Sequence, residues 1–147
     1  MTLEETARLA AAAMWAGDAA SKALGMEVLE AHPGRAVLAM TIRPDMLNGH
    51  QMAHGGLIFT LADSAFAYAC NSHGITTVAA QCQVTFLRPA RNGDRLVAEA
   101  RVITEGGRSG LTDVTVRVGD KAIAEFRGYS RSLGTSFLPQ DSSPGEG

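Results

Sequence analysis

Residues 55–72 read GGLIFTLADSAFAYACNS and are followed by His73-Gly74, a pair typical of a helix end. The run predicts one long helix that is apolar on nearly every face, through Leu57, Ile58, Phe59, Leu61, Ala62, Ala65, Phe66, Ala67, Tyr68 and Ala69. A helix that is apolar on every side is buried on every side. The rest of the chain is therefore expected to wrap around it.

After Gly74, segments in which apolar residues alternate with other residues predict the strands that wrap around the helix. Turn pairs separate them at Asn92-Gly93, Gly106-Gly107 and Gly119-Asp120. The predicted inward faces are Val78, Ala80, Cys82, Val84 and Phe86, then Leu96, Ala98, Ala100 and Val102, then Val114, Val116 and Val118, then Ala122, Ala124 and Phe126. Four antiparallel strands are expected to follow the long helix.

The segment before the long helix predicts a further helix and a hairpin. Thr2 and Glu5 form a capping box that starts a peripheral helix over residues 3–24, and Gly25 ends it. Residues 26–31 and 35–42 flank a Pro33-Gly34 turn and read as paired strands. The order predicts an α+β fold, an antiparallel sheet curled around one helix, with one domain over 1–134 and a disordered tail over 135–147.

Composition excludes several classes of protein. A chain of 147 residues suits one domain, and a net charge of −2 argues against a nucleic-acid-binding surface. Of 13 cationic residues only Lys22 and Lys121 are lysine, so arginines could still bind phosphate locally. The sequence offers neither a membrane-spanning apolar run nor a secretory signal pattern. Cys70 and Cys82 form no C-x-x-C motif, which favours a reducing cytoplasm.

Asp63 breaks the apolar pattern in the middle of the predicted buried helix, with Phe59 and Phe66 about one turn away on either side. Because a buried unpaired carboxylate is costly, Asp63 is paired, partly solvated or functional. A structural hydrogen bond to a neighbouring strand or loop is the alternative to a catalytic role.

The start of the same helix is the second unusual feature. No Ser, Thr, Asp or Asn stands immediately before Gly55 to cap the first backbone N–H groups. Free N–H groups at the positive end of a helix can bind an anion or a developing oxyanion. Capping by water or by His54 is the alternative.

The spacing of the two features has a consequence for assembly. Gly55 and Asp63 are eight residues apart, roughly 12 Å along a helix at 1.5 Å per residue. A reacting carbon must lie about 3 Å from both its oxyanion donor and its attacking group, so one chain does not easily supply both. If both act on one substrate, a dimer with antiparallel central helices is required.

Residues 47–56, LNGHQMAHGG, followed by residues 61–72, LADSAFAYACNS, resemble the hotdog-fold acyl-CoA thioesterases, and most of all the PaaI family of phenylacetic acid degradation thioesterases. Residues 84–90, VTFLRPA, with Gly93-Asp94 and residues 126–128, FRG, extend the resemblance, which covers roughly residues 20–134. It implies a hotdog fold and hydrolysis of an acyl-CoA thioester.

The resemblance also implies residue roles. The Gly55 N–H polarises the thioester carbonyl, and Asp63 of the partner subunit is nucleophile or general base, two alternatives that stay open. Asn48 and His54 position the carbonyl or the water, and Ser64 assists. Arg88, Arg91 and Arg108 are candidates for the coenzyme A phosphates, with a solvated surface role as the alternative for each.

The family further implies an acyl-CoA substrate, no metal, no separate cofactor, and a tetramer of two back-to-back dimers. Phenylacetyl-CoA or a ring-hydroxylated relative is the expected ester, with an acyl pocket near Met46, Leu47 and Phe59. His50 and His54 lack the Glu of a zinc motif. A hotdog hydratase or dehydratase on enoyl- or 3-hydroxyacyl-CoA, or a non-catalytic acyl-CoA-binding protein, remains the alternative function.

Overall fold

A computed structural model describes residues 1–139 of the chain, and residues 140–147 lie outside its description. Its strands are β1 (Glu27–His32), β2 (Arg35–Thr41), β3 (Ile75–Phe86), β4 (Arg95–Gly106), β5 (Ser109–Val118) and β6 (Lys121–Ser136). They form one six-stranded sheet in the order β1-β2-β4-β5-β6-β3, and every neighbouring pair is antiparallel. The two predicted strands before the long helix and the four after it are confirmed.

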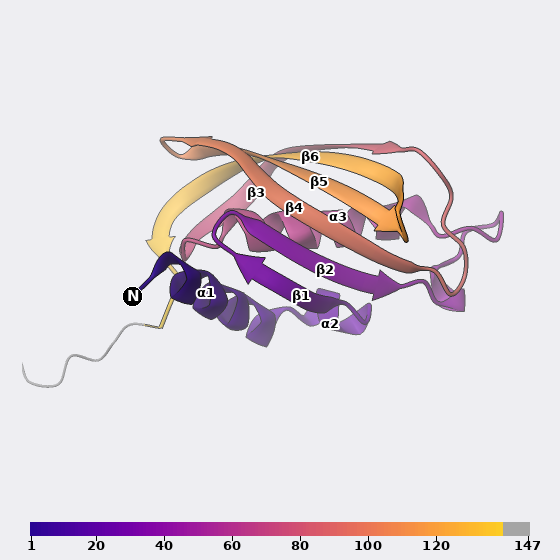
Figure 1. The fold of residues 1–147 in the computed structure, drawn as a ribbon, viewed down its shortest axis with the longest axis horizontal. Coiled ribbons are helices and arrows are strands. Elements are labelled where there is room, and N and C mark those ends of the chain that lie inside the picture. The colour runs from indigo at the N-terminus through magenta and orange to yellow at the C-terminus, as the bar shows by residue number, and fades with distance from the viewer. Residues whose placement is uncertain (140–147) are drawn as a thin grey trace, which may run out of the picture.

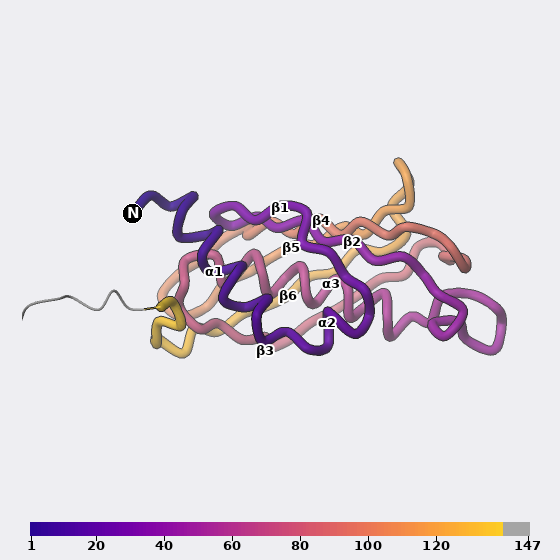
Figure 2. Tube along the Cα trace, turned by 90° about the horizontal axis from the view of Figure 1, so that it is seen from below, coloured from indigo at the N-terminus to yellow at the C-terminus, as the bar shows by residue number. Residues whose placement is uncertain are grey.

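The central helix α3 (Gly55–Cys70) lies against the inner face of this curled sheet. Figure 1 shows it behind the strands, and Figure 2 shows it between β1 and β4 above and β3 below. The helix ends two residues before the predicted end because the Asn71 side chain forms hydrogen bonds with backbone groups of α3 and β3 there. Its Nδ2 donates to the Ala67 carbonyl at 2.8 Å, and its Oδ1 accepts from the Thr77 N–H at 2.8 Å.

The core follows the predicted alternation in the middle of the sheet. Leu96, Ala98, Ala100, Val114, Val116, Ala124 and Phe126 are buried against α3 together with Leu61, Ala62, Ala65 and Phe66. The expectation that α3 is buried on every side is wrong for the isolated chain. Thr60, Asp63, Ser64 and Ala67 are only half-buried, because the sheet does not cover that side of the helix.

The N-terminal helix is interrupted where the sequence predicts it to continue. It forms α1 (Leu3–Gly17) and α2 (Ala19–Ala23), with Asp18 between them. Asp18 begins α2 by accepting the Ser21 N–H at 3.1 Å, so the alanine-rich run changes direction there. The capping box is confirmed, since the Thr2 side chain accepts the Glu5 N–H at 3.1 Å and the Glu5 side chain accepts the Thr2 N–H at 3.3 Å.

Strand β3 lies at the edge of the sheet and pairs only with β6. Its predicted inward face is only partly correct: Cys82 and Val84 pack against the core, whereas Val78 is 44% and Phe86 50% exposed. An edge strand with exposed apolar side chains presents unpaired backbone groups for a further strand.

The predicted domain boundary at residue 134 falls inside β6, which continues to Ser136. Beyond it, the Phe137 N–H donates to the Gly74 carbonyl at 3.0 Å and ties the chain to the end of α3. This contact lies across the fold and leaves no local pattern in the sequence. The rest of the predicted tail, residues 140–147, lies outside the described residues.

η1 (Pro44–Met46) is a short 3-10 helix that follows β2 and leads into the loop before α3.

Among the described residues, none of the helices combines the length and the apolar character needed to cross a membrane.

Candidate active site

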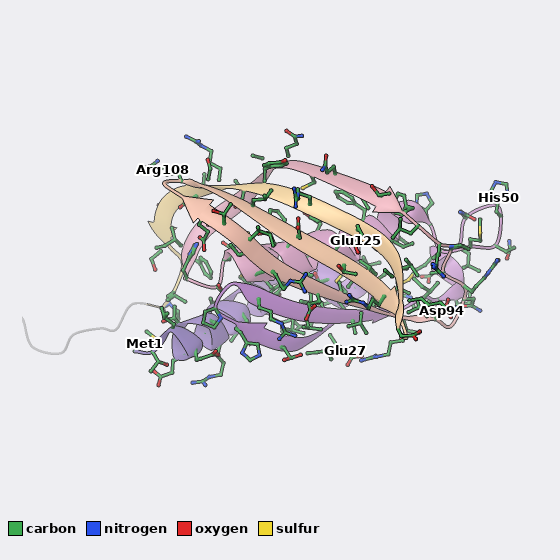
Figure 3. All side chains as sticks on the ribbon, turned by 45° about the horizontal axis from the view of Figure 1, so that its top comes forward. Met1, Glu27, His50, Asp94, Arg108 and Glu125 are labelled. Atoms are coloured by element: carbon green, nitrogen blue, oxygen red, sulfur yellow. The ribbon has the colours of Figure 1, made fainter. Side chains whose placement is uncertain are left out.

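The loop before α3 is organised by Asn48. Its Oδ1 accepts the N–H groups of His50 at 2.9 Å and Met52 at 3.2 Å, and its own N–H donates to the Met52 carbonyl at 2.7 Å. Gln51 takes the left-handed conformation (φ 61°) that this tight loop needs. In Figure 3 the loop projects from one end of the molecule, with His50 at its tip. The carbonyl oxygen of the Asn48 amide is thus committed to the loop, and its Nδ2 has no partner among residues 1–139.

His54 precedes α3 and caps it. Its Nδ1 accepts the Gly56 N–H at 2.9 Å, so the alternative of capping by His54 holds for Gly56. An imidazole nitrogen that accepts a backbone N–H carries no proton, so the proton of the neutral ring is on Nε2. The Gly55 N–H has no hydrogen-bond partner within residues 1–139.

Gly55 lies against the ring of Phe86. A Cβ placed on Gly55 would be 3.1 Å from Phe86 Cζ, so a larger residue would have to displace the ring. A cleft of about 340 Å³ opens there, lined by Asn48, Met52, Ala53, Gly55, Ile58, Phe86, Leu87, Arg88 and Pro89. The free N–H therefore stands beside a mostly apolar cleft large enough for part of a small ligand.

Asp63 lies two turns further along α3, on the half-buried side of the helix. Its carboxylate makes no hydrogen bond or ion pair with any residue in the range 1–139. The structural hydrogen bond that could explain it otherwise is therefore not found there. Burial raises the pKa of Asp63 above its ordinary value of 3.8. Burial and, secondarily, the Asp63 carboxylate raise the pKa of the Cys82 thiol on β3.

Ser64 is directed to a different neighbour. Its hydroxyl is 3.0 Å from that of Ser21 on α2, and Ser21 is almost fully buried. One turn later on α3, the Tyr68 hydroxyl donates to Asp18 at 3.1 Å. These two contacts attach α2 to α3 beside Asp63.

The structure keeps Gly55 and Asp63 apart within one chain. Both belong to one uninterrupted helix, which places them about 12 Å apart along its axis. Asn48, His54 and Gly55 lie together at the N-terminal end of α3, whereas Asp63 lies in the middle of the helix.

The three candidate arginines do not form one cluster. Arg88 lines the cleft, and the Arg91 N–H donates to Asp94 at 2.7 Å, in a turn at the His50 end of the molecule. Arg108 lies at the opposite end, in the turn between β4 and β5 (Figure 3). All three are exposed.

The residues that line the cleft differ from the expected acyl pocket. Met46 is fully buried, and the Phe59 ring packs against Phe126 with centroids 5.4 Å apart, so neither faces the cleft beside Gly55. Phe86 and Leu87 form part of its wall instead and were not predicted. The sequence feature that could have identified them is their position at the end of β3, immediately before Arg88-Pro89.

Among residues 1–139, no group of three or more His, Cys, Asp or Glu side chains is arranged to hold a metal ion. Cys70 and Cys82 are both free thiols.

Comparison with known proteins agrees with this geometry. The thioesterase superfamily profile matches residues 50–125. The acyl-coenzyme A thioesterase PaaI of Escherichia coli is 48% identical over 123 residues, 83% of this chain and 88% of that protein. The solved structure of the E. coli PaaI protein, from the phenylacetic acid degradation operon, superposes with a TM-score of 0.90 at 45% identity, covering 92% of this chain and 99% of that one. A Streptococcus mutans protein solved with acetyl-CoA bound gives a TM-score of 0.73 at 25% identity, covering 76% and 90%.

A curled sheet around one helix, with an uncapped N–H beside an apolar cleft, defines a hotdog-fold thioester hydrolase, and the chain belongs to the thioesterase superfamily. Within that superfamily it belongs to the same family as the acyl-CoA thioesterase PaaI of E. coli. The family resemblance, the fold class and the enzyme class indicated by the sequence are confirmed.

Proposed function

We propose that the protein hydrolyses aromatic acyl-CoA esters, phenylacetyl-CoA or a ring-hydroxylated relative, to the free acid and coenzyme A, as a step in phenylacetate degradation. The observation that carries the proposal is the unpartnered Gly55 N–H at the start of α3, beside an apolar cleft. The identity to E. coli PaaI supports the choice of substrate.

The carbonyl oxygen of the thioester accepts the Gly55 N–H, which stabilises the negative charge that develops on it. Asp63 of the partner subunit then acts in one of two ways. As general base it takes a proton from water while the hydroxide adds to the carbonyl carbon; the C–S bond then breaks, and the departing sulfur takes that proton and leaves as the coenzyme A thiol. As nucleophile its carboxylate adds to the carbonyl carbon, the C–S bond breaks, and the coenzyme A thiolate leaves. Water then hydrolyses the resulting anhydride to the acyl acid and the Asp63 carboxylate, and a proton from that water converts the thiolate to the thiol. Its raised pKa suits either role, because a less solvated carboxylate is more reactive.

The neighbouring polar groups position the substrate. Asn48 directs its free Nδ2, and His54 its Nε2–H, toward the carbonyl or the attacking water. Ser64 acts indirectly, since its hydroxyl is bonded to Ser21 and holds the helix turn that carries Asp63.

A dimer formed through β3 completes the site. Strand β3 packs against α3 and lies at the free edge of the sheet, so a second copy that pairs with β3 would extend the sheet beside α3. Antiparallel pairing of two β3 strands would bring the Ile75 end of one subunit, beside Arg108, to the Phe86 end of the other. Arg88 and Arg91 of one subunit and Arg108 of its partner could then hold the coenzyme A phosphates together. Two such dimers form a tetramer back to back.

The dimer can be tested with one matched pair of substitutions. Val78 and Leu29 are each 44% exposed, on the two opposite edge strands β3 and β1. Lysine on an edge strand opposes further strand pairing. Val78→Lys should shift light-scattering mass toward the monomer and abolish activity, and Leu29→Lys should do neither. A Val78→Lys protein that keeps its assembly and turnover would exclude β3 as the interface.

The enzyme needs no metal and no cofactor apart from the coenzyme A of its substrate, and we place it in the cytoplasm, where free Cys70 and Cys82 stay reduced.

The activity is tested by coenzyme A release from acetyl, hexanoyl, palmitoyl, benzoyl, phenylacetyl and hydroxyphenylacetyl thioesters, with wild type and Asp63→Asn side by side. Enzyme-only baselines correct for the two thiols. The wild type should release coenzyme A fastest from the aromatic esters, and Asp63→Asn should be slower by about 10²–10⁴-fold with an unchanged Tm. Release from no ester, or full activity in Asp63→Asn, would overturn the proposal; enoyl-CoA hydration would then be assayed.

A further inference from the structure

We propose that Phe86 determines the acyl preference of the enzyme, because its exposed ring forms the wall of the cleft directly beside the Gly55 N–H. The inference rests on the proposed function, since it concerns the acyl group of the same substrate.

The first observation is the orientation of the ring. A Cβ on Gly55 would lie 3.1 Å from Phe86 Cζ and 3.5 Å from both Cε1 and Cε2. These three atoms form the far end of the ring, and their nearly equal distances place the Cβ position above the plane of the ring rather than in line with it. Phe86 therefore turns one flat face toward Gly55 and leaves the opposite face uncovered by it.

The second observation is exposure. Phe86 is 50% exposed, whereas Phe66 and Phe126 are almost fully buried. The aromatic pairs within residues 1–139 are Phe59 with Phe126 and Phe66 with Phe126, and Phe86 belongs to neither. The face of Phe86 that is turned away from Gly55 therefore has no aromatic partner within residues 1–139 and is available to stack against another aromatic group.

The third observation is position. A thioester carbonyl that accepts the Gly55 N–H lies within hydrogen-bond distance of it, and the Phe86 ring beside Gly55 is then close to the first atoms of an acyl chain that enters the cleft. In phenylacetyl-CoA the ring is one methylene away from that carbonyl. The other apolar cleft residues, Met52, Ile58 and Leu87, offer contact area but no flat face.

The test compares Phe86→Leu with Phe86→Tyr and Leu87→Ala. Leucine keeps an apolar side chain without a stacking face, and tyrosine keeps the face. Leu87 is 51% exposed on the same cleft, so Leu87→Ala controls for loss of apolar area alone. kcat and KM are measured with phenylacetyl-CoA and hexanoyl-CoA, with Tm and assembly state checked for every variant.

Phe86→Leu should lower the phenylacetyl-to-hexanoyl ratio of kcat/KM about tenfold, mainly through KM, because stacking holds the bound ester as well as the transition state. Phe86→Tyr should keep the ratio, and Leu87→Ala should affect both esters alike. An unchanged ratio in an active Phe86→Leu enzyme would overturn the role of Phe86 and leave the proposed function standing. A wild type inactive on both esters would overturn the proposed function itself.

Discussion

The Nδ1 atom of His54 accepts the Gly56 N–H at 2.9 Å, and this contact separates the roles of the first two backbone amides of α3. The Gly56 N–H is capped by His54, whereas the Gly55 N–H has no partner within residues 1–139 and is the donor that the proposed mechanism requires. The same contact keeps the proton of the neutral imidazole on Nε2, the nitrogen that can donate to a ligand.

Substitution of His54 can separate capping from catalysis. His54→Ala removes the cap and should destabilise the fold by about 0.5–2 kcal/mol, with reduced activity. His54→Asn restores a good N-cap without an Nε2–H, so it should recover the stability and not the activity. Thermal denaturation and coenzyme A release on both variants check this; equal recovery of both properties would show that His54 only caps.

Activity should fall at acid pH because Asp63 must be ionised to act. Burial raises its pKa above 3.8, so the acidic limb of kcat/KM should have its midpoint above that value. The measurement is a pH profile of kcat/KM, with Tm and assembly state followed over the same range. Constant activity down to pH 3.8 in the intact protein would contradict this role.

The roles of the Oδ1 and Nδ2 atoms of Asn48 can be tested separately. Asn48→Asp keeps an oxygen for the His50 and Met52 N–H groups and loses the Nδ2 donor, so its Tm should stay near that of wild type while kcat/KM falls. Asn48→Ala loses both and should cost about 1–3 kcal/mol in addition, because two loop amides lose their acceptor. If the Asp variant is as active as wild type, Asn48 serves only the loop.

Gly128 on β6 should be required for packing. A Cβ there would lie 2.7 Å from Phe66 Cε2, far inside normal contact. Gly128→Ala should therefore destabilise the fold by about 1–3 kcal/mol, measured by chemical denaturation. Gly106→Ala, another strand glycine with nothing within 4 Å of its Cβ, should change stability little. Similar stabilities for the two variants would show that the Phe66 ring moves freely.

Sequence patterns predicted the parts of the fold that depend on local periodicity. The apolar run before His73 and the alternating segments after Gly74 gave the central helix and four of the strands. Asp63 and the uncapped helix start at Gly55 stood out because each breaks a local rule, whereas Asn48 and His54 were assigned roles through the family resemblance. The contact between the Phe86 ring and Gly55 left no such mark, since the two residues are brought together only when β3 passes the start of α3.

Two predictions failed for identifiable reasons. The alanine-rich N-terminal run was predicted as one helix but is interrupted at Asp18. Aspartate occurs both on exposed helix surfaces and as an N-cap, so its presence did not reveal that a second helix begins there. The apolar character of α3 does not distinguish a face buried by its own sheet from one left open beside an edge strand. The number of apolar residues in α3 therefore led to an overestimate of how much of this helix is buried within a single chain.

The carboxylate of Asp63 is unpaired within residues 1–139 and lies on the helix around which the whole sheet packs. Folding gains nothing from a charge at that place, so the catalytic role proposed for Asp63 would explain why the carboxylate is kept. A lineage released from selection for catalysis would be expected to replace this residue early, by an apolar one, and to gain thermal stability in doing so. Position 63 can thus serve as a marker in related sequences, separating chains still under selection as enzymes from those that keep only the fold.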